Sequence, residues 1–485
     1  MSTEAKPLVE RYDAVIGGES ISPGDYFDDL DPATGTTLAE VARCGSTEVD
    51  AAVAAARATF QLDWGRRAPS ERAAILTRIA TAIRRDAGQL ERLECLDTGK
   101  PLSQARADIE VSARYFDFYA HTIEAVYGST IPLGESVFAY TLREPHGVTA
   151  HIVPWNYPAQ MCGRTIAPAL AAGNCCVLKP AEEASLTTVS IAKLALEAGL
   201  PAGAFNVVPG LGEEAGAALA AHRGIDHLSF TGSNEVGRLV GQAAAENIVP
   251  VTVELGGKSP NIVFADADLE RAVPIIVRSI IQNAGQTCSA GSRLLVEESA
   301  HDRVLEAVAE RLRSVRLGAG IDDPDMGPLI TARQLERVQE LVDQGRDAGV
   351  LVLGGKRPDD RALRGGFFFE PTLFDSVDVA APIAQEEVFG PVLVASTFRD
   401  LDEAAQLVNA TGYGLVAGVW TRDISTAHVL VREIQAGQVF VNTYGAGGGV
   451  ELPFGGRKRS GHGREKGFEG LLAFTRTKSV AIGLG

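Results

Sequence analysis

Short apolar runs alternate with helical segments between residues 146 and 256, and this alternation limits the fold more than any other feature of the chain. Five of the runs have the length of strands: GVTAHIVP, CCVLKP, AFNVVP, DHLSF and PVTVEL. The segments between them repeat apolar residues at helical spacing or open with a capping residue. Strands that are apolar on both faces are typical of a parallel sheet covered by helices on each side. The predicted fold class is therefore α/β.

The rest of the chain supplies three further kinds of segment. Residues 46–122 repeat apolar residues at three- and four-residue spacing, which predicts helices. A second strand–helix alternation from about 260 to 455 predicts another α/β unit, entered through the Gly-rich stretch LGGKSP. Segments 124–144 and 472–485 have strand character but no local partner in the sequence. Unpaired strand edges of this kind are usually covered by another chain.

Composition excludes several functions. Asp plus Glu number 62 against 45 Lys plus Arg, so the net charge of −17 repels a phosphate backbone and no nucleic-acid partner is expected. No apolar run is long enough to cross a membrane, and the charged N-terminus has no apolar signal core. The six cysteines are scattered, without C-x-x-C or H-E-x-x-H, so neither a disulfide framework nor a metal site is predicted. A cytoplasmic location is expected.

Three side chains are candidates for chemistry. Cys288 lies in the polar, Gly-flanked loop NAGQTCSAGSR and is the best nucleophile among the six cysteines, with an inert loop cysteine as the alternative. Asn156 and Glu254 follow strands, and parallel sheets bind ligands at the carboxyl ends of their strands. Asn156 could donate to an oxyanion or form an Asx turn. Glu254 could act as a general base or cap the next element.

Signals for a nucleotide cofactor are weak when taken singly. The fingerprint G-x-G-x-x-G is absent. FTGSNEVG follows a strand and opens a helix, so its amides and Ser233 could hold a pyrophosphate. Lys179 and Glu182, at another strand end, could bind ribose hydroxyls or form a solvated ion pair. The residues by themselves indicate an α/β enzyme and leave its reaction open.

Seven motifs together resemble those of the NAD(P)-dependent aldehyde dehydrogenase superfamily, in the family's order and over nearly the whole chain: PWNYP, LKPAE, FTGS, VELGGK, GQTC, QEEVFGP and PFGG. The most specific pair is VELGGK and GQTC, because it places Glu254 34 residues before Cys288. The resemblance implies a Rossmann-type cofactor domain (1–123 and 146–256), an α/β catalytic domain (257–457) and a small β oligomerisation extension (124–145 and 458–485). It also implies a homodimer or a homotetramer.

The resemblance assigns catalytic roles to four residues. Cys288 matches the thiol that attacks the aldehyde to give a thiohemiacetal and, after hydride transfer, a thioester. Asn156 matches the oxyanion-hole side chain. Glu254 matches the base that activates the hydrolytic water, which favours hydrolysis over transfer of the acyl group to coenzyme A. Glu465 matches an acidic residue that assists proton relay.

The implied cofactor is NAD, because an acidic residue at position 182 repels the 2′-phosphate of NADP, which is the less favoured alternative. Lys179 and Glu182 match the adenine-ribose contacts, and Ser233 matches a pyrophosphate contact. The other implied cofactor contacts are Val153, Trp155, Gly232 and Val236, with Glu387 and Phe389 at the nicotinamide ribose and ring.

The substrate implied by the resemblance is an aldehyde that carries a carboxylate. Arg164, eight residues after Asn156, matches an arginine of succinate semialdehyde dehydrogenases, and Gln160 shares its helix face. Those relatives have a second arginine where this chain has Gln282. An ion pair between Arg164 and a structural acid is the alternative. Tyr157, Phe454 and the run YGAGGG (444–449) are expected to shape the pocket.

Rival functions stay open at this stage. They are oxidation of a neutral aldehyde, a cysteine hydrolase without a nicotinamide, acylation of coenzyme A, and a non-catalytic NAD-binding protein.

Overall fold

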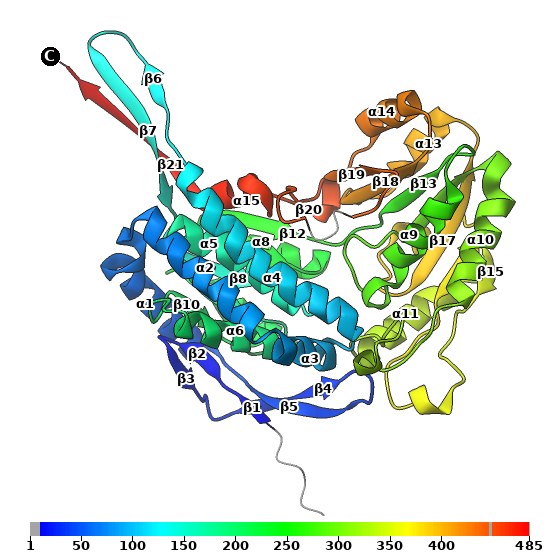
Figure 1. The fold of residues 1–485 in the computed structure, drawn as a ribbon, viewed down its shortest axis with the longest axis horizontal. Helices are drawn as coiled ribbons and strands as arrows, with labels where there is room; N and C mark the ends of the chain where they lie inside the picture. Colours follow the sequence, from blue (N-terminus) through cyan, green and yellow to red (C-terminus); the bar gives the residue numbers. More distant parts are fainter. Residues whose placement is uncertain (1–9, 446–448, 485) are drawn as a thin grey trace, which may run out of the picture.

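The computed structural model describes residues 10–445 and 449–484, and two large β-sheets form the centres of its two lobes (Figure 1). The first sheet has the strand order β20-β12-β11-β8-β9-β10-β2-β3. Its strands are β2 (Ala14–Ile16), β3 (Glu19–Ile21), β8 (Val148–Ile152), β9 (Cys175–Lys179), β10 (Phe205–Val207), β11 (His227–Thr231), β12 (Val251–Glu254) and β20 (Gly461–His462). The five strands predicted between 146 and 256 form its parallel centre, with antiparallel strands at both edges. The predicted α/β class is confirmed.

Helices cover the first sheet, as its apolar strands require. Residues 46–122 are helical as predicted, although Asp86 divides the long central run into two helices. The helices of this lobe are α1 (Ser46–Leu62), α2 (Pro69–Arg85), α3 (Ala87–Thr98), α4 (Leu102–Thr122), α5 (Pro158–Ala172), α6 (Leu186–Glu197), α7 (Ala217–Ala220), α8 (Asn234–Glu246) and α15 (Gly467–Ala473). Gly173 ends α5 in the left-handed conformation (φ 97°), which a residue without Cβ adopts at little cost.

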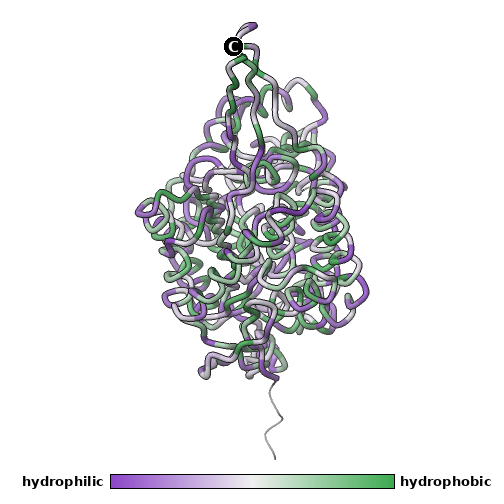
Figure 2. The backbone as a smooth tube through the Cα atoms, turned by 90° about the vertical axis from the view of Figure 1, so that its left-hand side faces the viewer, coloured by the Kyte–Doolittle hydropathy of each residue, from purple (hydrophilic) through white to green (hydrophobic). Residues whose placement is uncertain are grey.

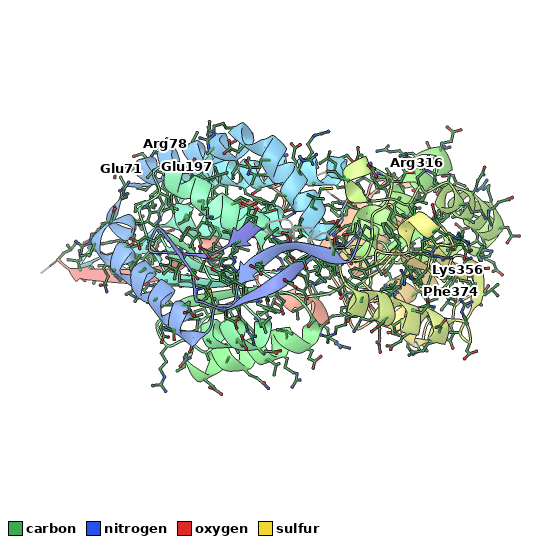
Figure 3. The ribbon with its side chains drawn as sticks, turned by 90° about the horizontal axis from the view of Figure 1, so that it is seen from below. Glu71, Arg78, Glu197, Arg316, Lys356 and Phe374 are labelled. Carbon is green, nitrogen blue, oxygen red and sulfur yellow. The ribbon has the colours of Figure 1, made fainter. Side chains whose placement is uncertain are left out.

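The second sheet confirms the second strand–helix alternation. Its order is β15-β16-β17-β14-β13-β18-β19, parallel except at β15. The strands are β13 (Pro260–Val263), β14 (Arg293–Glu297), β15 (Val350–Leu353), β16 (Thr372–Asp375), β17 (Val392–Phe398), β18 (Val416–Trp420) and β19 (Gln438–Val441). The helices are α9 (Leu269–Ile281), α10 (His301–Arg313), α11 (Ala332–Gly345), α12 (Pro382–Gln385), α13 (Leu401–Val408) and α14 (Ile424–Glu433). Figure 3 shows the lobes side by side, with Glu71, Arg78 and Glu197 on the first and Arg316, Lys356 and Phe374 on the second.

Two three-stranded sheets complete the fold. One contains β1 (Glu10–Tyr12), β4 (Tyr26–Asp31) and β5 (Thr36–Ala42), and the other contains β6 (Thr130–Pro132), β7 (Val137–Pro145) and β21 (Thr475–Gly483). Segments 124–144 and 472–485, which have no local partner in the sequence, find one in each other, because β7 and β21 pair antiparallel over their whole length. The sequence does not reveal this pairing, because strand pairing between distant segments leaves no local pattern.

The sheet of β6, β7 and β21 projects from the body (Figure 1), and the hydropathy colouring of Figure 2 marks hydrophobic residues along it. Phe138, Leu142 and Ile482 are each more than two-fifths exposed. The division of the chain into domains stays a prediction, but residues after 457 do not all belong to this extension, since β20 pairs with β12 in the first sheet. No helix among the described residues is long and apolar enough to span a membrane.

Candidate active site between the two sheets

A cavity of about 1960 Å³ lies where the carboxyl ends of β8, β11 and β12 face the loops of the second lobe. This is the position that parallel sheets favour for ligands. Most of the predicted site residues line it: Trp155, Asn156, Tyr157, Gln160, Arg164, Gly232, Ser233, Val236, Cys288, Glu387, Phe389 and Phe454. The predicted residues that do not line it are Val153, Lys179, Glu182, Glu254 and Glu465. Residues 446–448 of the Gly-rich run lie outside the described part of the chain.

Cys288 lies on a loop with an unusual backbone. Asn283, Ala284 and Gly285 have consecutive positive φ angles of 49°, 52° and 74°, the first two of which are costly for residues with a side chain. A Cβ on Gly285 would lie 2.1 Å from the carbonyl oxygen of Gly390, so only glycine fits there. The thiol of Cys288 is half-buried and lines the cavity. Burial raises its pKa to about 12, although the charge of Arg164 opposes the shift, so the resting side chain is a thiol.

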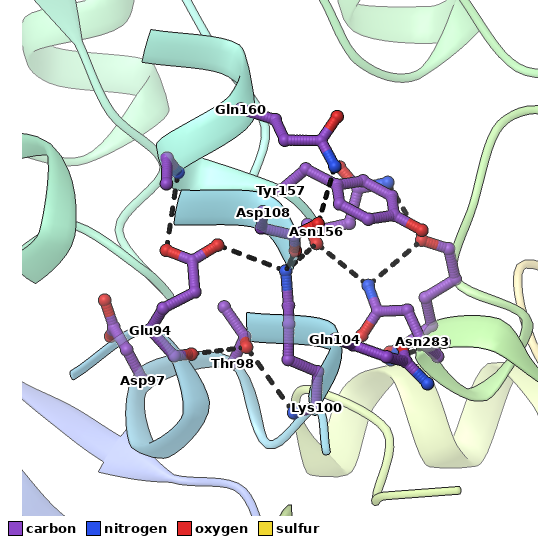
Figure 4. A network of polar contacts seen from close by, with 12 residues as sticks. Glu94, Asp97, Thr98, Lys100, Gln104, Asp108, Asn156, Tyr157, Gln160 and Asn283 are labelled. Atoms are coloured by element: carbon purple, nitrogen blue, oxygen red, sulfur yellow. Dashed lines mark hydrogen bonds and ion pairs between the residues drawn. The ribbon is translucent and has the colours of Figure 1, made fainter. Parts of the chain in front are cut away.

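Asn156 is held by its backbone and by its side chain. Its Nδ2 donates to the carbonyl oxygen of Gln286 over 2.8 Å. Its own carbonyl oxygen accepts from Lys100 Nζ (3.0 Å) and Asn283 Nδ2 (2.9 Å), both of which are labelled in Figure 4. The residue is buried and lies beside the loop that carries Cys288. A side-chain amide has two N–H donors, so one remains for an oxygen of a ligand.

Lys100 is the centre of this network, and sequence reasoning missed it. TGKP indicates only the end of a helix, and nothing local shows that the lysine turns inward. Its ammonium is fully buried, 3.1 Å from Glu94 Oε1 and 2.5 Å from Asp108 Oδ2, and lies 4.5 Å from the centroid of the Tyr157 ring. The phenol of Tyr157 in turn shares a 2.7 Å hydrogen bond with Thr287 Oγ1, next to Cys288.

Gln160, a predicted substrate contact, belongs to the same network. Its Nε2 donates to Asp108 Oδ1 over 2.5 Å, so this side chain is engaged with the protein although it lines the cavity. Its role towards substrate stays a prediction.

Glu254 and Glu465 lie close enough for their charges to interact. Glu254, at the end of β12, is buried, and its two carboxylate oxygens have no hydrogen-bond partner among the described residues. Burial and the charge of Glu465 raise its pKa well above the usual value. Glu465 is also buried, and its Oε1 accepts from Ser229 Oγ over 3.0 Å.

Arg164 forms an ion pair with Glu465, with its Nε 2.5 Å from Oε2. The guanidinium also lies over the Phe454 ring, with Cζ 4.3 Å from the centroid. The Nε and Nη2 atoms of Arg164 are buried and have no hydrogen-bond partner of good geometry among the described residues. An ion pair between Arg164 and an acid of the protein is the alternative to a contact with a substrate carboxylate, and this geometry favours the ion pair. The contact of Arg164 with a substrate carboxylate stays a prediction.

The predicted contacts to the adenosine half of a dinucleotide lie at strand ends of the first sheet. Lys179 ends β9, and its Nζ lies 2.6 Å from Glu182 Oε2. Burial of Glu182 is the largest single influence and acts to raise its pKa, but the charge and hydrogen bond of Lys179, together with backbone hydrogen bonds, lower the pKa overall. Ser233 caps α8 by accepting from the backbone N–H of Val236 over 3.3 Å.

The predicted nicotinamide contacts come from the second lobe. Glu387 Oε1 accepts from the backbone N–H of Gly257 over 3.0 Å, and burial raises the pKa of Glu387 to about 7. A Cβ on Gly256 would lie 2.1 Å from Glu387 Oε2, which explains the glycine beside the carboxylate. Phe389 (φ 56°) packs edge-on against Trp155, with ring centroids 5.3 Å apart.

One cavity therefore holds the thiol of Cys288 and the fixed amide donor of Asn156. Two acids lie nearby: the charge of Glu254 acts on the pKa of Cys288, and the charge of Glu465 acts on the pKa of Glu254. A nucleophile, an oxyanion donor and a buried acid are the groups that covalent catalysis at a carbonyl requires. The cavity extends to the first turn of α8, whose backbone N–H groups suit a phosphate. This volume is much larger than a small aldehyde needs, so there is room for a dinucleotide.

Comparisons with known proteins agree with this arrangement. The family described as "Aldehyde dehydrogenase family" matches residues 20–480. A hydroxyisobutyraldehyde dehydrogenase of Mycolicibacterium austroafricanum is 43% identical over 462 residues, which are 95% of this chain and 91% of that protein.

Two solved structures have the same fold. An indole-3-acetaldehyde dehydrogenase variant of P. syringae, in complex with NAD+ and IAA, has a TM-score of 0.96 at 42% identity. The match covers 99% of this chain and 98% of that protein's chain. A betaine aldehyde dehydrogenase of Staphylococcus aureus, in complex with NAD+, has a TM-score of 0.95 at 36% identity, with coverages of 97% and 94%.

Proposed function

This chain belongs to the aldehyde dehydrogenase family, and on that premise we propose that it oxidises an aldehyde to a carboxylic acid with NAD, through a thioester on Cys288. The observation that carries the proposal is the position of Cys288 in one cavity with the amide of Asn156. NAD, when bound, supplies the acceptor for the hydride that leaves the substrate carbon. Lys179, Glu182, Ser233, Glu387 and Phe389 would hold it.

Attack by Cys288 on the aldehyde carbon forms the C–S bond and places negative charge on the carbonyl oxygen. In this proposal the second N–H of Asn156 stabilises that charge, since the other N–H is already fixed to Gln286. The thiol must first lose its proton, and its raised pKa makes the thiolate scarce near neutral pH.

Hydrolysis of the thioester needs a base for the attacking water, and we assign this role to Glu254. Its buried carboxylate has no hydrogen-bond partner among the described residues, and its pKa is raised, so the deprotonated form is a strong base. We propose that Glu465, fixed by Ser229 and Arg164, assists proton relay, since its charge acts on Glu254.

The preference for NAD over NADP rests on Glu182. Its lowered pKa keeps it ionised near neutral pH, and a carboxylate at the adenosine ribose repels a 2′-phosphate. Self-association through β7 and β21, whose exposed apolar residues project from the body, stays a prediction, as does the cytoplasmic location.

The finer proposal is that the aldehyde carries a carboxylate, with a neutral aliphatic or aromatic aldehyde as the alternative. A cysteine hydrolase is disfavoured, because no hydrogen bond of the described residues joins a histidine to Cys288. Acylation of coenzyme A is disfavoured by Glu254, and a non-catalytic role leaves the thiol and its amide donor without a purpose.

The test follows NADH formation by the purified protein on succinate semialdehyde and on neutral aliphatic and aromatic aldehydes, with Cys288→Ala as the blank. Turnover that the Cys288→Ala variant lacks supports the mechanism. If NAD binds and no aldehyde is oxidised, the covalent mechanism is refuted, and stimulation by added coenzyme A would instead indicate acyl transfer.

A further inference from the structure

Lys466 is the cation beside Cys288 that the proposed mechanism leaves unused. Arg164 and Lys466 are the two cations whose charges lower the pKa of Cys288. Arg164 forms an ion pair with Glu465, and its Nε and Nη2 atoms are buried without a hydrogen-bond partner of good geometry among the described residues. Lys466 is partly exposed, lines the cavity and makes no ion pair or hydrogen bond through its side chain with any described residue. Its Nζ lies 5.2 Å from the centroid of the Phe454 ring.

The backbone holds Lys466 in a conformation that residues with a side chain rarely adopt. Its φ of 61° and ψ of 171° fall in a region that is essentially restricted to glycine. The chain on either side is fixed: Phe454 and Glu465 exchange two backbone hydrogen bonds of 2.7 and 2.8 Å, and the N–H of Gly467 donates to Val450 over 2.8 Å. Strained residues of this kind gather at functional sites, where a fixed direction of the side chain is useful.

No carboxylate of the described residues forms an ion pair with Lys466, although charged groups of the protein act on it. The groups that act on it are Arg164 from α5, Cys288, Glu254 from β12 and its neighbour Glu465. Arg164 and Glu465 neutralise each other, and the raised pKa of Glu254 favours its uncharged form. Burial, and then the charge of Arg164, lower the pKa of Lys466 to about 7. An anion bound there would stabilise the ammonium, whereas a cation would be repelled.

We propose that Lys466 binds a carboxylate on the substrate, so that aldehydes with a distal carboxylate are preferred over neutral and cationic aldehydes of similar size. This inference rests on the proposed function and moves the predicted carboxylate contact from Arg164 to Lys466. The ring of Phe454 lies next to both cations and would pack against the carbon chain between the aldehyde and the carboxylate. The residue is thus a determinant of specificity.

The test compares three aldehydes of different charge: succinate semialdehyde, butyraldehyde and betaine aldehyde. The variants are Lys466→Met, Lys466→Glu and Lys466→Arg, with Lys466→Gly as a second deletion of the side chain that relieves the backbone strain. Lys356→Met is the matched control, since Lys356 is exposed on the second lobe and is not among the residues that line the cavity (Figure 3). Steady-state kcat and KM are measured for each aldehyde.

We expect Lys466→Met and Lys466→Gly to raise KM for succinate semialdehyde about ten- to hundred-fold more than KM for butyraldehyde, because a charge-assisted contact is lost. Lys466→Arg should retain most of the preference, and Lys466→Glu should favour betaine aldehyde. Inhibition by succinate, compared with butyrate, should weaken in parallel, and this readout involves no chemical step.

An equal loss for all three aldehydes, carried by kcat, would overturn the inference and leave Lys466 as a group that only activates the thiol. Unchanged inhibition by succinate would also overturn it. The proposed function fails separately, if the wild-type protein oxidises none of the three aldehydes.

Discussion

Replacement of Lys100 by Met should destabilise the protein by about 3–5 kcal/mol at pH 7, the usual cost of removing one partner from a buried ion pair. The ammonium is fully buried and contacts two carboxylates, Glu94 at 3.1 Å and Asp108 at 2.5 Å, in the network of Figure 4. Burial acts to lower the pKa of Lys100, but the two carboxylates raise it above the usual value, so the lysine is charged throughout the accessible pH range. Methionine fills the space of the side chain and leaves both carboxylates without a cation.

The loss of stability should depend on pH. Burial raises the pKa of Glu94, and the charge of Lys100 acts against that rise, so the pKa rises further in the Lys100→Met variant. A carboxyl group whose pKa is raised on folding contributes its stability at low pH and loses it as pH rises through the folded-state value. The deficit of the variant should therefore be larger at pH 8 than at pH 5.5.

The assay is equilibrium urea unfolding at the two pH values, with the midpoint and slope of the transition measured for each variant. The control is the triple variant Glu94→Gln, Lys100→Met, Asp108→Asn, which removes all three charges and should recover most of the lost stability. A deficit below about 1 kcal/mol, or an equal deficit at both pH values, would refute the reasoning that the pair is buried and uncompensated. Because Lys100 also fixes the carbonyl of Asn156, kcat should fall by about ten- to hundred-fold.

Four further predictions concern the reaction. Asn156→Ala should lower kcat by about 10²- to 10³-fold, measured by single-turnover kinetics, while NAD binding, measured by titration, persists. A loss of kcat below about tenfold would show that Asn156 does not stabilise the oxyanion. Glu254→Gln should give a burst of NADH followed by slow turnover as the thioester accumulates, and stopped-flow traces without a burst would contradict its role. Because burial raises the pKa values of Cys288 and Glu254, kcat should rise from pH 6 to pH 9. The ratio of kcat/KM for acidic over neutral aldehydes should fall above about pH 7, because Lys466 loses its proton there, and a ratio that does not change with pH would contradict this. Glu182→Gln should shift the ratio of kcat/KM for NAD over NADP towards NADP by about tenfold, and an unchanged ratio would show that this carboxylate does not face the 2′ position.

The elements of the fold were predictable where their signal is local. The strands from Val148 to Glu254 are buried on both faces, so their apolar runs are visible without any knowledge of their neighbours. The positions of Asn156 and Glu254 followed from the same signal, because the ends of parallel strands meet at one edge of the sheet. Cys288 differs from the other cysteines by its polar, Gly-flanked loop. The match of its motif to a known family supplied the roles that these residues could not reveal by themselves.

The sequence by itself determined the class of fold, the family and the principal reactive groups, because each is recorded in a short stretch of residues. Only the tertiary structure decided which charges are satisfied. Arg164 pairs with Glu465, Lys100 turns inward to two carboxylates, and β7 pairs with β21 at the other end of the chain. Each contact joins segments from different elements, and the strength of a charge interaction depends on distance and burial, which no local pattern records. For that reason the sequence indicates Arg164 as the substrate contact, whereas the structure shows that Arg164 pairs with Glu465 and that Lys466 has no ion-pair partner among the described residues.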